Sequence, residues 1–198
     1  SAPASARRYF SQGINCDVIN IQAGDCYVTD ENEVITTVLG SCIAACIRDK
    51  RICMGGMNHF MLPAASDTFE SADLSYGMRY GTYAMEYLIN EILRRGGRRE
   101  TLEVKLFGGA SVMATLSDIG RRNIEFVRDF LRTEGYHVVS EDLGDVFPRR
   151  VKYFPTTGRA MVKRMQPAVV REIADLEQAH MQSIRAEEQP VKADIELF

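Results

Sequence analysis

The sequence lacks any long uninterrupted run of apolar residues, and its amino terminus lacks a charged stretch followed by an apolar one. A helix that spans a membrane needs about 18 consecutive apolar residues, and a secretory signal needs the charged-then-apolar pattern. These two absences predict a cytoplasmic protein with no membrane insertion.

Extremes of composition are also missing. The 198 residues are 45% hydrophobic and 26% charged, with 15 glycines and 6 prolines, values that exclude collagen-like, fibrous and wholly disordered chains. This length suits one globular core with an appended arm. The chain is too short for two full catalytic domains.

Cysteine is sparse, and its count of 5 is odd. An odd number argues against a disulfide scaffold and for a reducing compartment. The net charge of -3 excludes a strongly basic protein, although basic side chains outnumber acidic ones over residues 94–171 and the reverse holds over 172–198. We interpret this asymmetry as a solvated surface rather than a nucleic-acid site. An acidic protein partner explains it as well as nucleic acid would.

Hydrophobic periodicity predicts strands and helices. Residues 79–95, 117–135 and a segment after Pro167 have helical spacing. Short β-like segments separated by turns occupy the first third and are expected to form a β-meander. The predicted strands cover 18–23, 26–29, 34–39, 43–47, 52–57, 102–107, 137–141, 149–154 and 159–165.

These elements predict an α+β fold, a layered sandwich of mostly antiparallel β-sheet with flanking helices. We expect a loose N-terminal arm at residues 1–15, a main domain at 16–166, and a C-terminal helix with an acidic tail at 167–198. No internal repeat or low-complexity tract is present.

Histidine is scarce too, so histidine chemistry has only three candidates: His59, His137 and His180. His59 is distinguished by its neighbours, since it lies shortly after a Gly-Ser-Cys run, residues 40–42. If a hairpin turned about Asp49 and Lys50, Cys42 would lie diagonal to His59 on one face of the sheet, within reach of a thiol–imidazole hydrogen bond. Gly40 would let the backbone bend, so that the N–H groups of Ser41 and Cys42 could form an oxyanion pocket.

These residues also allow other interpretations. A cytosolic cysteine is by default a buried structural residue, and Cys46 and Cys53, inside apolar segments, fit that description. A zinc site from Cys42, Cys46, Cys53 and His59 is disfavoured, because two cysteines four residues apart on a strand are separated by roughly 13 Å. The glycine pairs lack the pattern of a phosphate loop. We therefore expect neither a metal nor a cofactor.

Four motifs in order resemble the CheD family, the chemoreceptor glutamine deamidases of bacterial chemotaxis. The motifs are Leu39-Gly40-Ser41-Cys42, residues 55–63 (GGMNHFMLP), residues 105–110 (KLFGGA) and residues 119–123 (IGRRN). The resemblance covers roughly residues 18–165. It implies a layered fold with a cysteine-hydrolase site related to that of the cytotoxic necrotising factor toxins.

The resemblance also implies roles for individual residues. Cys42 matches the family's nucleophile, His59 its base, and Thr36 the hydroxyl that orients the imidazole, with Thr37 adjacent and easily confused with it. Gly40, Ser41 and Asn58 are expected at the oxyanion and substrate-binding positions. The implied reaction converts receptor glutamines to glutamate through a cysteine thioester and so tunes adaptation in chemotaxis.

The implied partners are the cytoplasmic helices of methyl-accepting chemoreceptors and a CheC-type phosphatase. An interaction module that binds CheC or receptors, with minor catalysis, stays open as the alternative to an enzyme.

The terminal helix carries a second pattern. Residues 174–179 consist of a small residue, two further residues, a Glu-Gln pair and a second small residue. This pattern resembles the receptor segments that the family deamidates. One interpretation is an ordinary surface helix with a chance Glu-Gln pair. The other is a substrate mimic that presents Gln178 to Cys42.

Overall fold

The computed structural model describes residues 2–63, 71–112 and 117–188, which form two five-stranded sheets with helices against them. Sheet 1 has the order β1-β2-β4-β9-β10, and sheet 2 has the order β3-β6-β5-β7-β8. Most pairings are antiparallel, but β2 runs parallel to β4 and β8 runs parallel to β7. The predicted α+β class with mostly antiparallel sheet is confirmed.

The strands of sheet 1 come from both ends of the domain. They are β1 (Arg7–Ser11), β2 (Cys16–Asn20), β4 (Glu33–Leu39), β9 (Arg149–Phe154) and β10 (Arg159–Arg164). Those of sheet 2 are β3 (Cys26–Thr29), β5 (Ile43–Asp49), β6 (Met54–Asn58), β7 (Leu102–Gly108) and β8 (His137–Leu143). The helices are α1 (Ser71–Arg94), α2 (Ser117–Glu134) and α3 (Val170–Glu188), with short 3-10 turns η1 (Arg99–Thr101) and η3 (Pro167–Val169).

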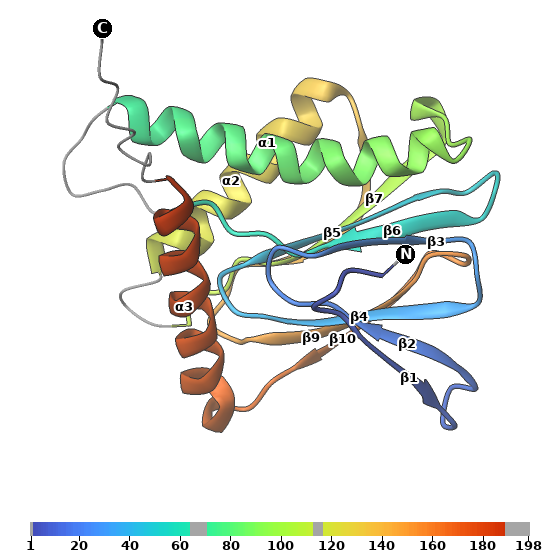
Figure 1. Ribbon diagram of the computed structural model, residues 1–198, viewed down its shortest axis with the longest axis horizontal. Coiled ribbons are helices and arrows are strands. Elements are labelled where there is room, and N and C mark those ends of the chain that lie inside the picture. Colours follow the sequence, from blue (N-terminus) through green and yellow to red (C-terminus); the bar gives the residue numbers. More distant parts are fainter. Residues whose placement is uncertain (1, 64–70, 113–116, 189–198) are drawn as a thin grey trace, which may run out of the picture.

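The two sheets stack face to face, and α1 and α2 cover the outer face of sheet 2 (Figure 1). Strand β5 is buried along nearly its whole length because both of its faces are covered. Ala44 and Cys46 point into the core between the sheets, whereas Ile43, Ala45 and Ile47 point into the core under α1 and α2. This strand leads directly from the Gly-Ser-Cys run, so the run is anchored at the centre of the molecule.

Helix α3 runs across one end of the two sheets (Figure 1). Its apolar stripe consists of Ile173, Ala174, Met181 and Ile184, all buried, at the spacing of one helix face. Ala174 and Met181 belong to the core between the sheets. The helix is therefore packed onto the same body as the predicted main domain, while residues 189–198 of the predicted acidic tail lie outside the described residues.

Two expectations about the N-terminal third were wrong. The predicted loose arm contributes β1, which pairs antiparallel with β2 and carries an ion pair from Arg8 to the buried Glu33 at 2.7 Å. The predicted β-meander does not form, because β3 leaves sheet 1 to pair with β6 in sheet 2, and β2 then lies beside β4 in parallel.

The β5–β6 hairpin also differs from its predicted register. Cys46 pairs with Met57 and Asp49 with Met54, a shift of four residues, because the turn spans residues 50–53 rather than a tight pair. Cys53 lies in this turn with a positive φ of 52° and is exposed, so its predicted burial was wrong; Cys46 is buried as expected.

None of the helices in the described part of the chain combines the length and apolar character needed to cross a membrane.

Asp49, at the end of β5, is expected to be a strong contributor to stability. It is fully buried, and its carboxylate accepts hydrogen bonds from the Thr101 hydroxyl at 2.7 Å and from the backbone N–H groups of Arg98 and Arg51, both at 2.8 Å. Burial opposes the charge, but these hydrogen bonds prevail and lower the Asp49 pKa. Asp49→Ala should lower the free energy of unfolding by about 2–4 kcal/mol in urea denaturation.

The exposed Asp30 provides the control, since Asp30→Ala should change stability by less than about 0.5 kcal/mol. Because the folded-state pKa of Asp49 is depressed, its contribution is complete above the unfolded-state pKa of about 3.9 and is lost as the pH falls through the folded value. A wild-type-minus-variant difference that stayed constant under acid would contradict this assignment.

Candidate active site

Three consecutive backbone N–H groups after β4 point at one carboxylate. Gly40 N and Cys42 N donate to Glu177 Oε1 at 2.8 and 3.1 Å, and Ser41 N donates to Oε2 at 2.9 Å. The Ser41 hydroxyl adds a 2.6 Å hydrogen bond to Oε2. A Cβ at position 40 would lie 2.9 Å from both carboxylate oxygens, so glycine is required for this approach. The Gly-Ser-Cys run thus forms a binding site for negatively charged oxygen.

The carbonyl groups of the same three residues are held on the opposite side. Gly40 O accepts from Ala110 N and Cys42 O from Gly109 N, both at 2.9 Å, and Ser41 O accepts from the Asn123 side chain at 2.8 Å. The first two donors belong to the Gly-Gly-Ala segment, residues 108–110, at the end of β7. At Gly108, φ is +111° and a Cβ would lie 2.1 Å from Cys42 O, so only glycine permits this contact. The direction of the three N–H groups is therefore set by the surrounding fold.

Asn123 is a further residue of the site, which was not predicted from the sequence. It is fully buried on α2, where its amide nitrogen holds Ser41 O and its amide oxygen accepts from Leu62 N at 2.9 Å. Its position at the end of the fourth motif, residues 119–123, was the sequence signal that could have identified it. Asn123 connects α2 to both chain segments that carry the predicted pair.

Cys42 and His59 occupy neighbouring positions on the two chain segments. Ile43 and Phe60 form a bridge with two backbone hydrogen bonds of 2.9 Å, and Cys42 and His59 each directly precede one of these residues. In an antiparallel pair such positions are diagonal neighbours. The predicted relationship thus holds, although it was derived from the wrong register.

The Cys42 thiol is fully buried. Burial, followed by the negative charge of Glu177 and a hydrogen bond to it, raises the pKa of Cys42 well above its ordinary value. A thiol with a raised pKa stays protonated near neutral pH and is a poor nucleophile. In this conformation, burial and the charge of Glu177 disfavour the thiolate form of Cys42.

His59 is held by Thr37. Its Nδ1 lies 2.7 Å from the Thr37 hydroxyl oxygen, and that hydroxyl donates its single hydrogen to Ile21 O at 2.9 Å. The Thr37 oxygen must therefore accept a hydrogen bond from Nδ1–H. The proton on Nδ1 leaves Nε2 with a free lone pair.

The Nε2 atom of His59 is buried and has no hydrogen-bond partner among the described residues. Burial, and then the proximity of His180, lower the pKa of His59 to about 3. The ring is thus neutral at physiological pH, with an unoccupied acceptor. The tautomer leaves the lone pair of Nε2 available to accept a proton, but with so low a pKa the ring is a weak base in this conformation.

Thr36 does not orient the imidazole, so this prediction was wrong. Its hydroxyl donates to Val151 O of β9 at 2.9 Å. Successive side chains on a strand point to opposite faces, so only one of the two threonines can face His59. Thr37 is that residue.

Asn58 is also placed differently from its predicted position near the oxyanion pocket. Its amide oxygen accepts from Ala45 N at 2.9 Å, and its amide nitrogen donates to Ala84 O at 3.2 Å and toward the Met85 sulfur. Both ends of the amide are thus used to join β5 to α1. Asn58 holds the fold beneath the site and has no free donor for an oxyanion.

Gln178 is half-buried, and the carboxylate at residues 40–42 belongs to its neighbour Glu177. The prediction that α3 presents Gln178 to Cys42 is thus off by one residue. The apolar stripe of α3 fixes the rotation of the helix and brings Glu177, which is buried, to the centre of the contact.

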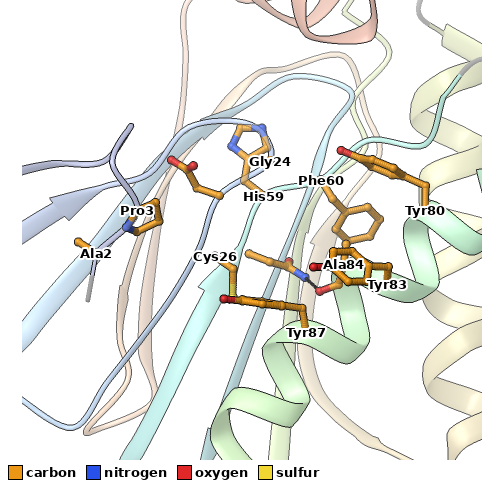
Figure 2. Close-up of a pocket in the computed structure, with 12 residues that line it drawn as sticks. Ala2, Pro3, Gly24, Cys26, His59, Phe60, Tyr80, Tyr83, Ala84 and Tyr87 are labelled. Atoms are coloured by element: carbon orange, nitrogen blue, oxygen red, sulfur yellow. Dashed lines mark hydrogen bonds between the residues drawn. The ribbon is translucent and has the colours of Figure 1, made fainter. Parts of the chain in front are cut away.

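A cavity of about 460 Å³ adjoins His59. Figure 2 shows His59 on one side of it and Tyr80, Tyr83 and Tyr87 projecting from α1 on the other. Burial, then the charge of Glu187, raises the pKa of Tyr80 to about 12, so this phenol is a neutral donor. His59 thus lines a polar and aromatic cavity large enough for several water molecules, although its Nε2 atom is buried in this conformation.

Within residues 2–63, 71–112 and 117–188, no group of three or more His, Cys, Asp or Glu side chains is arranged to hold a metal ion. Of the four candidate zinc ligands, Cys46 and Cys53 lie apart from Cys42 and His59. Cys46 lies in the core between the sheets and Cys53 in an exposed turn.

Comparison with known proteins identifies the family of the chain. The model of the CheD family, described as CheD chemotactic sensory transduction, matches residues 61–164. The probable chemoreceptor glutamine deamidase CheD of Methylobacillus flagellatus is 45% identical over 192 residues, covering 96% of this chain and 94% of that protein. The proteins of the same name from Halorhodospira halophila and Hydrogenovibrio crunogenus are 45% and 47% identical, covering 96% and 90% of this chain.

The family-model match begins just after His59, whereas the alignment with Methylobacillus flagellatus extends over nearly the whole chain. Identity of this level over this length, together with the family-model match, establishes that the chain belongs to the CheD family.

Proposed function

We propose that this protein is a chemoreceptor glutamine deamidase that uses Cys42 as nucleophile, His59 as base and Thr37 as the residue that orients His59. The observation that carries the proposal is the group of three convergent N–H groups of Gly40, Ser41 and Cys42, already occupied by a glutamate side chain. The relatives' name, chemoreceptor glutamine deamidase, supplies the substrate.

The first half of the reaction forms a thioester. His59 Nε2 takes the Cys42 proton, and the thiolate attacks the side-chain carbonyl carbon of a glutamine. The carbonyl oxygen becomes negatively charged and is stabilised by the N–H groups of residues 40–42. The C–N bond then breaks, and the nitrogen leaves as ammonia with the proton from His59.

The second half hydrolyses the thioester. A water molecule loses a proton to His59 Nε2 and attacks the thioester carbon, and the C–S bond breaks. The Cys42 thiolate recovers its proton from His59, and the side chain is released as glutamate. The cavity beside His59 provides space for this water. The new carboxylate on the receptor is a site for methylation, which is how the reaction would tune adaptation in chemotaxis.

The test of this function is release of ammonia from cytoplasmic chemoreceptor fragments incubated with the protein. A deamidase releases one ammonia for each glutamate formed. The alternative, a module that binds receptors with minor catalysis, would retain receptor fragments on a column without releasing ammonia.

A CheC-type phosphatase is proposed as a second partner. The support for this partner is that a helix, α3, already lies against residues 40–42, so a helix fits on this surface. A phosphatase helix that presents an acidic or amide side chain would use the same donors. Binding of CheC that was unaffected by removing Glu177 would argue against a shared surface.

The two adjacent threonines give a matched test of the assignment of Thr37. Both are buried, and each donates to one backbone carbonyl, so Thr→Val at either position removes one such bond. Thr37→Val should lower kcat roughly fivefold with little change in KM, because about 1 kcal/mol of transition-state stabilisation is lost with the hydrogen bond that orients His59. Thr36→Val should leave kcat unchanged and affect only stability.

The readout is the kinetics of ammonia release at several pH values. With the Nδ1 partner removed, the pH profile of Thr37→Val should shift while that of Thr36→Val should not. The reverse ranking would restore Thr36 as the orienting residue.

A further inference from the structure

Glu177 is a buried carboxylate that no cation neutralises: among the ion pairs of the described residues none includes it. It is held instead by the three N–H groups of residues 40–42 and by the Ser41 hydroxyl, at 2.6–3.1 Å. Anions that accept several backbone N–H bonds are well stabilised without a counter-charge. Glu177 therefore occupies this site in the way that a bound ligand would.

The helix that carries Glu177 fits the site closely. Ala174, one turn before Glu177, is fully buried, and Met181, one turn after it, is also buried. His180 lies on the same side, with its ring 3.4 Å from the position of a Cβ on Gly24. Gly24 N in turn donates to His59 O at 2.8 Å. Helix α3 thus contacts the segment that carries Cys42. Through His180 it also lies against Gly24, which is hydrogen-bonded to His59.

With α3 docked, Cys42 and His59 are enclosed. Cys42 is fully buried, and His59 Nε2 has no partner among the described residues. The charge of Glu177 contributes, after burial, to the raised pKa of Cys42. No second side chain can enter the group of N–H donors while Glu177 occupies it.

We propose that α3 is an intramolecular product mimic that closes the active site, with Glu177 in the position of the glutamate that deamidation produces. A receptor helix must displace α3 before its glutamine can reach Cys42. The inference rests on the proposed function, because only a glutamine deamidase has a helix-borne glutamate as its product.

The proposal makes a chemical prediction about residue 177. In the Glu177→Gln variant the docked side chain becomes a substrate. Cys42 Sγ would attack the carboxamide carbon of the substituted side chain, the C–N bond would break and ammonia would leave with the His59 proton. Water would then cleave the C–S bond and restore the thiol, so the balance is glutamine plus water to glutamate plus ammonia.

Peptide mapping of purified Glu177→Gln by mass spectrometry tests this step. Residue 177 should be found as glutamate in the protein with Cys42 intact and as glutamine in the double variant with Cys42→Ala. The neighbouring Gln178 should remain glutamine in both proteins, which controls for spontaneous deamidation.

Thiol alkylation tests the closure without relying on catalysis. In the full-length protein, limiting iodoacetamide should label the exposed Cys53 first and leave Cys42 protected. In Glu177→Ala, labelling of Cys42 should become at least about tenfold faster, as expected if the open state is a tenth or less of the population in the native protein. Cys46, in the core between the sheets, should stay protected and so report that the fold is intact.

Asp175→Ala is the matched control, because it removes an exposed carboxylate from the same helix. It should change neither Cys42 labelling nor activity on receptor fragments, whereas Glu177→Ala should raise that activity by about the same factor as the labelling.

The outcomes separate the two proposals. If receptor glutamines are converted, but Glu177→Gln keeps its carboxamide and Glu177→Ala does not speed labelling of Cys42, the product mimic is overturned and the deamidase stands. If labelling of Cys42 accelerates, but neither the carboxamide of Glu177→Gln nor any receptor glutamine is converted, the deamidase is overturned, and with it the identification of Glu177 as a product.

Discussion

Cys42→Ala is expected to abolish deamidation of chemoreceptor glutamines, with a loss on the order of 10⁴-fold or more, because no thioester can form without the thiol. The fold should persist. Cys42 is small, and its backbone N–H and C=O groups, which hold the site together, remain in the variant. Ammonia release should be measured in the full-length protein and in Glu177→Ala, so that closure by α3 does not mask the effect.

Cys53→Ala is the control for this variant, since Cys53 is also a free thiol but lies in an exposed turn. It should retain full activity. If Cys42→Ala kept more than a small fraction of wild-type ammonia release, the nucleophile would have to be another group.

His59→Ala is expected to have the second largest effect. Nucleophile and base act as a unit, so removing either costs a similar amount, and loss of general base catalysis alone is worth about 10²–10⁴-fold. Because burial lowers the pKa of His59 to about 3, the ring of the closed protein does not change charge between pH 5 and 8.

Added imidazole should partly restore activity to His59→Ala, because the cavity beside His59 is open to small molecules. His137→Ala, which removes an exposed histidine, is the control and should be fully active. A loss of only a few-fold in His59→Ala would show that another group serves as the base.

The elements of the fold were largely predictable because their signals are local. The C-terminal ends of α1 and α2 and the strands β3, β7 and β9 follow from turn residues and alternation within each segment, whereas α1 begins at Ser71, eight residues before its predicted start. What failed was pairing between segments. The route of β3 into the other sheet depends on contacts with β6, which no local pattern encodes, and so the expected meander was wrong.

The pairing of Cys42 with His59 could be predicted even though the predicted hairpin register was wrong. A hairpin shifted by four residues keeps every side chain on the same face, since the strand period is two. Cys42 and His59 therefore stay on one face, and a shift of four residues exchanges one diagonal relation between them for the other. The same period explains the error at Thr36, because a shift of a single residue exchanges the two faces.

The role of Glu177 could not be found from local pattern alone. It is more than a hundred residues away in sequence from the N–H groups that it contacts. The sequence also does not distinguish which residue of the Glu-Gln pair faces the site. The rotation of α3 about its axis decides between them, and that rotation is set by how its apolar stripe packs against the sheets.

We propose that Cys42 and His59 convert a receptor glutamine to glutamate by hydrolysis. The most direct measurement is peptide mapping of chemoreceptor cytoplasmic fragments after incubation with Glu177→Ala protein in water enriched in heavy oxygen. We expect specific glutamines to appear as glutamate with one heavy oxygen each, because thioester hydrolysis takes its oxygen from water, and no conversion by the double variant that also carries Cys42→Ala. Receptor fragments that keep all their glutamines, or that are converted equally by the double variant, would contradict the claim.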